Sequence, residues 1–225
     1  MPDPDTLAAR LAETRERIAA AAAEAGRDVA ELTTVVVTKF HPPATVRELH
    51  ALGVTDVGES RHQEARRKSA ELAEPGLTWH FVGQLQSNKA RQALDYARVV
   101  HSVDRPSLVD ALSGDRAVDV FLQVNLTADP ARGGVRPDGL EALAERAAAA
   151  EGLRLLGVMA VAPLGEEPRS AFSRLRRHSE LVTAVVPEAR YISAGMSGDF
   201  REAILEGATH LRIGSAITGN RPARP

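Results

Sequence analysis

Lys39 is the residue whose surroundings in the sequence point most directly to chemistry. It follows the run Thr33–Thr38, whose valines and threonines are typical of a buried strand. An ammonium group kept from water must find a counter-charge, lose its proton, or condense with a carbonyl group to form a Schiff base. The alternative is that the strand ends in solvent and Lys39 extends into water. The residues that the other strands place beside Lys39 decide between the two.

Two glycine-containing segments late in the chain could bind an anion. Ser197 precedes a predicted helix near residues 198–206, and the first N–H groups of a helix attract negative charge. Gly214 and Ser215 follow a predicted strand near residues 209–213. Each segment alone has an ordinary explanation, a helix cap for the first and a turn for the second. Beside a Schiff-base lysine they predict a phosphorylated aldehyde as ligand, and pyridoxal 5′-phosphate has both groups.

Arg212 lies within the last predicted strand, where a permanent charge is unusual. One explanation is a structural ion pair with Glu59. The other places the guanidinium against the pyridine nitrogen of the cofactor. Because arginine keeps its proton at neutral pH, it would hold that nitrogen unprotonated and make the ring a weak electron sink. Such a site would bind the cofactor firmly and stabilise carbanions poorly.

Alternating strands and helices must position these residues. Hydrophobic patterning predicts eight strands, near residues 33–38, 54–58, 77–83, 98–102, 117–125, 153–161, 190–194 and 209–213. An opening helix with Leu7, Leu11 and Ile18 on one face ends at Gly26. The other predicted helices lie near residues 43–52, 60–73, 86–95, 105–113, 137–150, 167–185 and 198–206.

This alternation predicts an α/β fold, a single (β/α)8 TIM barrel with an additional N-terminal helix. An open doubly wound sheet would show the same local pattern, although no Gly-x-Gly-x-x-Gly follows the first strand. A barrel places functional residues at the C-terminal ends of its strands. These ends carry Lys39, Glu59 with Ser60, Gly83, His101 with Ser102, Asn125, the segments 159–163 and 193–197, and Arg212 with Gly214 and Ser215.

Two other sets of residues are weaker candidates for a functional site. His101, Ser102 and Asp104 are the residue types of a hydrolase triad, but neighbours in sequence rarely converge as a triad does. The segment Arg132–Gly134 could contact phosphate, although a flexible loop is the better explanation. No histidine spacing indicates a metal site.

Composition limits the class of protein. The 225 residues contain 28 Lys plus Arg and 30 Asp plus Glu, so a net charge of −2 gives no general field for nucleic acid. The chain has no cysteine, which is consistent with a reducing compartment, and we expect a cytoplasmic protein. The first residues lack the layout of a signal peptide, and no stretch approaches the roughly 18 apolar residues of a membrane span. We expect one domain, residues 1–225, that binds neither nucleic acid nor membrane.

Several motifs together resemble the YggS/PROSC family of pyridoxal-phosphate homeostasis proteins. The resemblance runs in order from about residue 5 to 221. The motifs are Val37-Thr38-Lys39, Val57-Gly58-Glu59, the segment from Trp79-His80-Phe81 to Lys89, Val100-His101-Ser102-Val103-Asp104, Gly195-Met196-Ser197-Gly198-Asp199-Phe200 and Arg212-Ile213-Gly214.

The resemblance implies a barrel related to the N-terminal domain of alanine racemase, which holds pyridoxal phosphate as a Schiff base. It assigns the cofactor lysine to Lys39, the phosphate contacts to Ser197, Gly214 and Ser215, and the arginine facing the pyridine nitrogen to Arg212. Glu59 and Ser60 complete the implied cofactor-binding set. Many relatives have other residues where Phe40, Ser60 and Ala194 stand, and Ser60 is expected to weaken a contact to the cofactor ring or its hydroxyl.

Three functions are compatible with these residues. The resemblance implies a carrier that buffers pyridoxal phosphate and delivers it to apo-enzymes without robust catalysis, as a monomer or weak dimer. A small amino-acid racemase is the alternative, but it needs an acid opposite Lys39, and neither Tyr96 nor Tyr191 lies in a matching motif. A cofactor-free Schiff-base aldolase acting on a phosphosugar would use the same lysine and loops.

Overall fold

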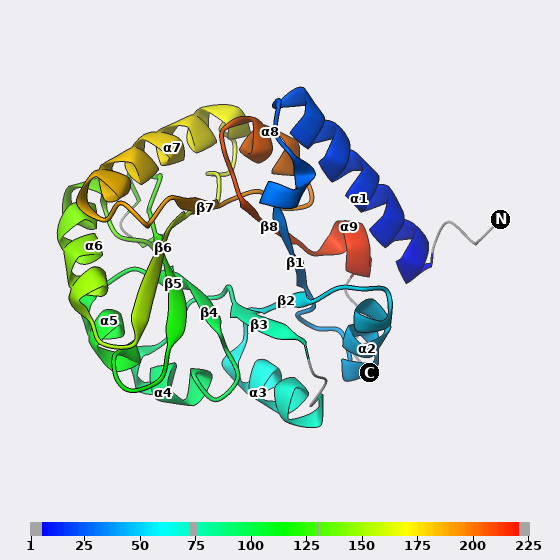
Figure 1. Ribbon diagram of the computed structural model, residues 1–225, viewed down its shortest axis with the longest axis horizontal. Helices are drawn as coiled ribbons and strands as arrows, with labels where there is room; N and C mark the ends of the chain where they lie inside the picture. The colour runs from blue at the N-terminus through cyan, green and yellow to red at the C-terminus, as the bar shows by residue number, and fades with distance from the viewer. Residues whose placement is uncertain (1–5, 73–75, 130, 221–225) are drawn as a thin grey trace.

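Eight parallel strands form a closed barrel in the computed structural model, which describes residues 6–72, 76–129 and 131–220. Neighbours in sequence are neighbours in the barrel, and β8 closes it by pairing with β1 (Figure 1). The predicted (β/α)8 barrel is confirmed, and the open doubly wound sheet is excluded. The strands are β1 (Thr33–Val37), β2 (Asp56–Glu59), β3 (Thr78–Phe81), β4 (Val99–Val103), β5 (Val118–Gln123), β6 (Leu153–Met159), β7 (Tyr191–Ser193) and β8 (His210–Ile213).

Helices surround the barrel (Figure 1). The additional helix α1 packs against α8 and α9, with Leu7, Leu11 and Ile18 buried as their spacing predicts. The α-helices are α1 (Leu7–Glu24), α2 (Pro43–Ala51), α3 (His62–Glu71), α4 (Ala90–Ala93), α5 (Pro106–Leu112), α6 (Leu140–Ala149), α7 (Pro168–Val185), α8 (Phe200–Leu205) and α9 (Ser215–Thr218). Three 3-10 turns are η1 (Val29–Glu31), η2 (Ser87–Lys89) and η3 (Pro137–Gly139).

The differences from the predicted elements are confined to their ends and to short helices. The predicted helix near 86–95 is a 3-10 turn followed by one turn of α4, and the helix near 198–206 begins two residues later. Helix α9 and η1 had no strong periodic signal because each is only one turn long. Residue 73 of the helix predicted near 60–73, and the ends of the domain predicted over 1–225, lie outside the described residues.

Successive side chains along each strand lie alternately in the main hydrophobic core and inside the barrel. Val57, Trp79, Leu211 and their counterparts on the other strands pack in the main hydrophobic core. Because successive strand side chains point to opposite faces, the residues between them point into the barrel.

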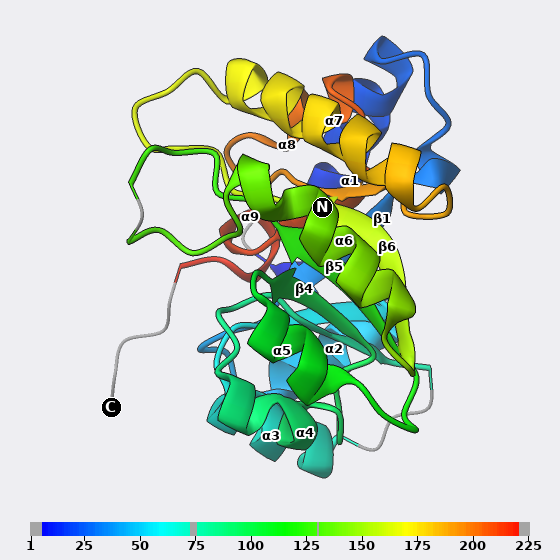
Figure 2. The ribbon, with the colours of Figure 1, turned by 90° about the vertical axis from the view of Figure 1, so that its left-hand side faces the viewer.

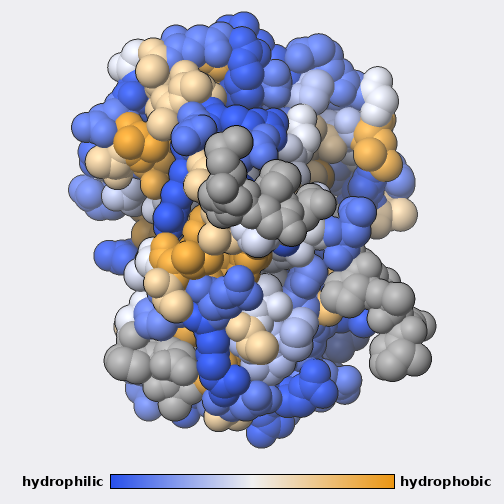
Figure 3. Space-filling view, turned by 90° about the vertical axis from the view of Figure 1, so that its right-hand side faces the viewer, coloured by the Kyte–Doolittle hydropathy of each residue, from blue (hydrophilic) through white to orange (hydrophobic). Residues whose placement is uncertain are grey.

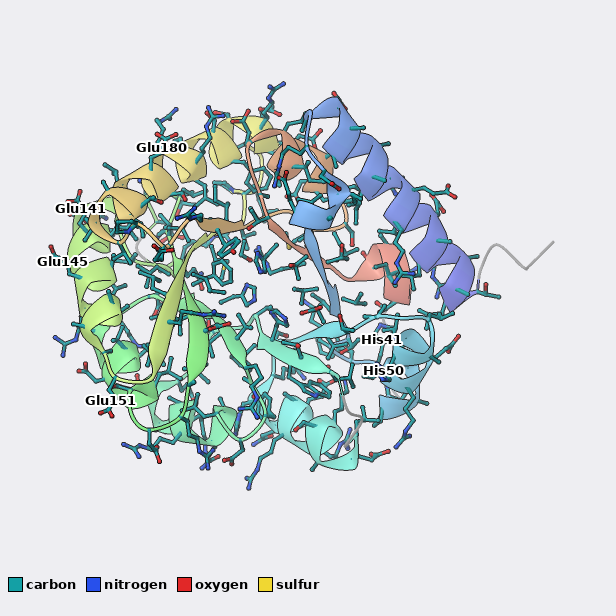
Figure 4. All side chains as sticks on the ribbon, in the orientation of Figure 1. His41, His50, Glu141, Glu145, Glu151 and Glu180 are labelled. Carbon is teal, nitrogen blue, oxygen red and sulfur yellow. The ribbon has the colours of Figure 1, made fainter. Side chains whose placement is uncertain are left out.

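The interior of the barrel is partly polar. A second apolar cluster consists of Val99, Phe121, Leu156 and Met159, and the ring of His101 stacks on Phe121 at 4.7 Å between centroids. Figure 4 shows the side chains that crowd the space inside the ring of strands, with His41 and His50 outside it on the α2 side. The barrel is therefore a filled core that can carry hydrogen bonds from one end to the other.

Long loops extend past the strand ends on the side of α9 (Figure 2). Arg174 of α7 ties two of them together, because it pairs with Glu166 after β6 and donates to the carbonyl of Leu126 after β5 at 3.2 Å. The face that carries α1, α9 and α2 is largely hydrophilic, with a band of apolar residues near its middle (Figure 3). Among the described residues, every helix is too short or too polar to cross a membrane.

Candidate functional site

A cavity of about 620 Å³ opens at the C-terminal ends of six of the strands. It brings together six of the seven residues that the sequence predicts for the site. The lining residues are Val37, Lys39, Ser60, Val82, Gly83, Val161, Met196, Ser197, Gly198, Arg212, Gly214 and Ser215.

Strand alternation explains which residues reach this cavity. Along β1 and the turn after it, Val37 and Lys39 line the cavity, whereas Thr38 between them is buried on the other side. At the end of β2 the same alternation turns Ser60 to the cavity and Glu59 away from it. The predicted site residue Glu59 therefore does not line the cavity.

Lys39 is exposed, so of the two alternatives the second holds: the strand ends at the surface and Lys39 extends from it. Strand β1 ends at Val37, and Lys39 and Phe40 form a turn at the mouth of the cavity. Phe40 has a φ of 71°, a left-handed conformation that a bulky side chain rarely adopts. Its N–H donates to Glu64 Oε1 at 2.6 Å, which holds the turn in place. Lys39 thus offers an accessible amine on a constrained backbone.

The fully buried lysine is Lys68, on the inner side of α3. Its Nζ lies 2.7 Å from Glu59 Oε1 and 2.8 Å from Glu64 Oε1, and it donates to the carbonyl of Thr38 at 2.8 Å. Thr38 Oγ1 also donates to Glu59 Oε1 at 2.7 Å. We call Lys68, Glu59, Glu64 and Thr38 the Lys68 cluster. It anchors the backbone on both sides of Lys39.

The Lys68 cluster changes the role predicted for Glu59. Burial raises the pKa of Glu59, and the Lys68 ammonium opposes that rise. Its partner is Lys68, so the alternative of an ion pair between Glu59 and Arg212 is wrong. Glu59 supports the segment that carries Lys39, and its second oxygen, Oε2, is buried without a hydrogen-bond partner.

Sequence reasoning missed Lys68 because α3 is strongly charged and resembles a solvated helix. The available signal was the pairing of Glu64 and Lys68, four residues apart on one helix face. Their burial depends on β1 and β2, which the helix sequence does not reveal.

Two backbone loops with small residues form one wall of the cavity. Ser197 Oγ accepts the N–H of Ala216 at 3.1 Å, which joins the two loops and leaves the Ser197 hydroxyl hydrogen available to a ligand. A Cβ on Gly198 would meet nothing within 4 Å, and one on Gly214 would meet only Val37, at 3.7 Å and beyond. Packing within the described chain therefore does not require either glycine, and both leave room for a ligand to approach the backbone.

The local geometry of this wall differs from the predicted helix N-terminus. Helix α8 begins at Phe200, and Asp199 Oδ1 accepts the N–H of Met196 at 2.6 Å to close a turn that contains Ser197. Burial raises the pKa of Asp199, against the opposing effect of its hydrogen bond from Met196. Ser197 is thus presented by a closed turn.

Arg212 is buried beneath the cavity that it lines. Its Nη1 donates to Ser193 Oγ at 2.6 Å and its Nη2 to the carbonyl of Ala160 at 2.9 Å. Burial lowers the pKa of Arg212 to about 10, so the side chain stays charged at neutral pH. The remaining N–H groups of the guanidinium are the permanent donors available to the cavity.

The other polar residues at the strand ends form hydrogen bonds or ion pairs within the protein. The amide of Asn125 donates to the carbonyls of Asp129 and Arg132, which organises the loop after β5. His101 bonds to Ser193 and not to Ser102, and Asp104 pairs with Arg105, so no hydrolase triad forms from these neighbours.

The half-buried His210 inside the barrel should make folding stability depend on pH. Burial and the nearby His80 lower the pKa of His210 to about 4 from the ordinary 6.5. The unfolded chain therefore binds more protons between these values, and stability should fall by about 3 kcal/mol as the pH drops from 6.5 to 4. Urea unfolding across this range should show a smaller loss in His210→Gln. The matched variant His50→Gln, outside the barrel, should keep the wild-type loss; equal losses in all three proteins would contradict the prediction.

The fold and site define a class of protein. Residues 10–222 match the family model described as the N-terminal domain of alanine racemase. This match spans the barrel from α1 to the end of β8 and both loops that form the cavity wall.

Similar proteins narrow the class further. The pyridoxal phosphate homeostasis protein of Pseudomonas aeruginosa is 43% identical over 224 residues, which cover 96% of each chain. That of Mycobacterium tuberculosis is 41% identical over 240 residues, covering 95% of this chain and 92% of the relative. The solved structure of PipY from Synechococcus elongatus, with PLP bound, superposes with a TM-score of 0.83 at 35% identity and covers 95% of this chain and all of PipY. The chain belongs to the family of pyridoxal phosphate homeostasis proteins, as its motifs indicate.

Proposed function

We propose that this protein binds pyridoxal 5′-phosphate in the cavity as a Schiff base on Lys39, and that it buffers and delivers the cofactor without robust catalysis of its own. The main support is that one cavity brings together an accessible amine, a wall of small residues and a charged arginine. The cofactor supplies an aldehyde that condenses with an amine, releasing water, and a phosphate and a pyridine ring for recognition.

The number of lysines supports Lys39 as the attachment point. The chain has three, Lys39, Lys68 and Lys89. Lys68 is fully buried and paired with two carboxylates, and Lys89 lies in η2 and does not line the cavity. Lys39 is the lysine that combines exposure with a place in the cavity.

The glycine-lined wall supports the phosphate end of the proposal. Ser197 can donate its hydroxyl hydrogen, and Gly198 and Gly214 allow a phosphate to approach their backbone. We propose that Ser197, Gly214 and Ser215 hold the phosphate and that Ser60 contacts the ring. Glu59 acts indirectly, through the Lys68 cluster.

Ser197→Ala should weaken retention of the cofactor without preventing attachment to Lys39. A hydrogen bond to a charged group contributes about 1.5 to 3 kcal/mol, so we expect the dissociation constant to rise about ten- to a hundred-fold. Equilibrium dialysis measures this, and absorbance of the saturated variant should still show the Schiff base. Ser69→Ala, on the exposed part of α3, is the matched control. Equal dissociation constants for the two variants would refute the role of Ser197.

The tyrosines of the chain argue against a racemase. Two-base racemisation needs an acid on the ring face opposite the lysine. Tyr96 is buried and contacts His62 at 3.2 Å, and Tyr191 lies at the start of β7, at the end of the barrel away from the cavity. Neither lines the cavity. Purified protein should form no D-amino acid at enzymatic rates, and turnover above about 1 per second in a chiral assay would overturn the carrier proposal.

Arg212 is a second argument against a racemase. A permanently charged donor at the pyridine nitrogen would keep that nitrogen unprotonated and limit its ability to withdraw electrons. We propose that Arg212 has this position and that the site therefore favours storage of the cofactor over its use in catalysis.

Transfer of the cofactor to an apo-enzyme tests the carrier function. The loaded protein is mixed with an apo-enzyme that requires pyridoxal phosphate, with and without a trap for the free cofactor. Activation that persists with the trap is the expected result, and activation that disappears with it would contradict direct delivery. We further propose that the chain acts in the cytoplasm as a single domain, as a monomer or weak dimer, with apo-enzymes as its partners.

A further inference from the structure

A continuous series of buried hydrogen bonds runs through the barrel from Arg212 to the opposite end. Its members lie on five strands and point inward, and apart from Arg212 none is explained by the proposed cofactor contacts. We call Ser193, His101, His80 and Asp56 the interior chain. Its hydrogen bonds are Arg212 Nη1 to Ser193 Oγ at 2.6 Å, Ser193 Oγ to His101 Nδ1 at 2.8 Å, His101 Nε2 to His80 Nδ1 at 2.9 Å, and His80 Nε2 to Asp56 Oδ1 at 2.9 Å.

The donor and acceptor capacities of these groups allow every hydrogen bond to point the same way, from Arg212 toward Asp56. Arg212 can only donate, so Ser193 accepts from it. When His101 Nδ1 is bare, the Ser193 hydroxyl donates its own hydrogen to that nitrogen. A neutral His101 then carries its proton on Nε2 and donates to His80, which in turn donates from Nε2 to the Asp56 carboxylate. With both imidazoles neutral, every member donates once toward Asp56 and no donor is unpaired.

The surroundings favour this neutral arrangement. Burial lowers the pKa of His101 well below its ordinary value, and the nearby His80, Arg212 and His210 lower it further. Burial alone would raise the pKa of Asp56, but hydrogen bonds from His80 and Thr55 lower it, so the carboxylate is ionised at neutral pH. A charged donor stands at one end of the chain and a charged acceptor at the other.

Arg212 needs such support because its charge is buried: the Asp199 charge raises its pKa, but among the described residues no salt bridge fixes its guanidinium. Two of its five N–H groups are fixed by Ser193 and the carbonyl of Ala160. The orientation of the guanidinium therefore depends on Ser193 being an acceptor, which in turn depends on His101 accepting the Ser193 hydrogen.

We infer that the interior chain positions Arg212: its one-way hydrogen bonds fix the guanidinium and the donors that it presents to the cavity. The members are positioning residues, because only Arg212 reaches the cavity. Asp56, half-buried at the start of β2 at the far end of the barrel, sets the direction of the whole chain. The inference deepens the proposed function and rests on it only where cofactor retention is measured.

The first test needs no cofactor. In the ligand-free protein at neutral pH, 15N chemical shifts should show His80 and His101 both protonated on Nε2 and bare on Nδ1. Asp56→Leu should change the tautomer of at least one of them, because His80 loses its acceptor. Asp56→Asn should preserve both, since its amide oxygen can still accept from His80. Wild-type histidines with protonated Nδ1, or unchanged tautomers in Asp56→Leu, would overturn the inference.

The second test measures the effect on the cavity. Coupling through packed networks changes affinities by about 2- to 30-fold, so Asp56→Leu should raise the dissociation constant for pyridoxal phosphate within that range. Asp119→Leu is the matched control, because Asp119 is equally exposed at 25% on β5 and pairs with the surface residue Arg154. Equal retention in both variants, with urea midpoints showing that both fold, would overturn the inference. Wild-type protein that fails to bind the cofactor would refute the proposed function and leave the tautomer result standing.

Discussion

Lys39→Ala should abolish the Schiff-base absorption of the protein mixed with pyridoxal phosphate. The covalent bond needs a primary amine in the cavity, and no other lysine lines it. The proposed phosphate contacts at Ser197, Gly214 and Ser215 are untouched, so residual cofactor should bind non-covalently and leave on dialysis. Absorbance before and after dialysis measures both effects, and an unchanged spectrum in the variant would remove the assignment of Lys39.

The three lysines provide an internal control for this experiment. Lys89→Ala should keep the full absorption band, because Lys89 lies outside the cavity. Borohydride reduction of the wild-type Schiff base, followed by peptide mapping, should place the label on the peptide that contains Lys39. A label on Lys68 would show that the buried cluster opens in solution, contrary to its geometry.

Lys68→Met should destabilise the fold more than any surface substitution. The change removes the cation that neutralises two carboxylates, one of which, Glu59, is fully buried. Removing one partner of a buried ion pair costs about 3 to 5 kcal/mol. Urea unfolding should show a lower midpoint with little change in slope.

Two further variants separate this effect from a loss of packing. Lys89→Met should change the free energy of unfolding by no more than about 0.5 kcal/mol, because Lys89 has no ion pair among the described residues. The double variant Glu59→Gln with Lys68→Met should recover part of the loss, since it removes the stranded buried charge. A midpoint for Lys68→Met equal to that of Lys89→Met would contradict the role of the cluster.

The barrel could be predicted because each strand carries its own signal. Runs such as Val35–Val37 and Val118–Gln123 are rich in β-branched and apolar residues, and helices with an apolar stripe separate them. The one-turn elements η1 and α9 could not be predicted, because they contain too few residues for a period. The shortened helix near 86–95 shows the same limit.

The site could be predicted only in part, for a different physical reason. The ends of the strands identified Lys39, Ser60 and Gly214, but the position of each strand end within one residue decides whether a side chain faces the cavity or the helices. Ser60 lines the cavity, whereas Glu59, one residue earlier, is buried against Lys68. Lys68 depends on contacts among three elements, so no single segment of the sequence indicates its burial.

The pairing of β1 with β8, in which Val36 lies opposite Ile213, has a consequence for how the protein is made. Lys39 lies near the beginning of the chain and Gly214 near its end, and the two come together directly when β8 pairs with β1. A chain still emerging from the ribosome therefore has the lysine long before it has the rest of the site. Contacts so distant in sequence form late in folding. A ligand that needs both sides recognises only finished molecules, and its binding energy stabilises barrel closure itself.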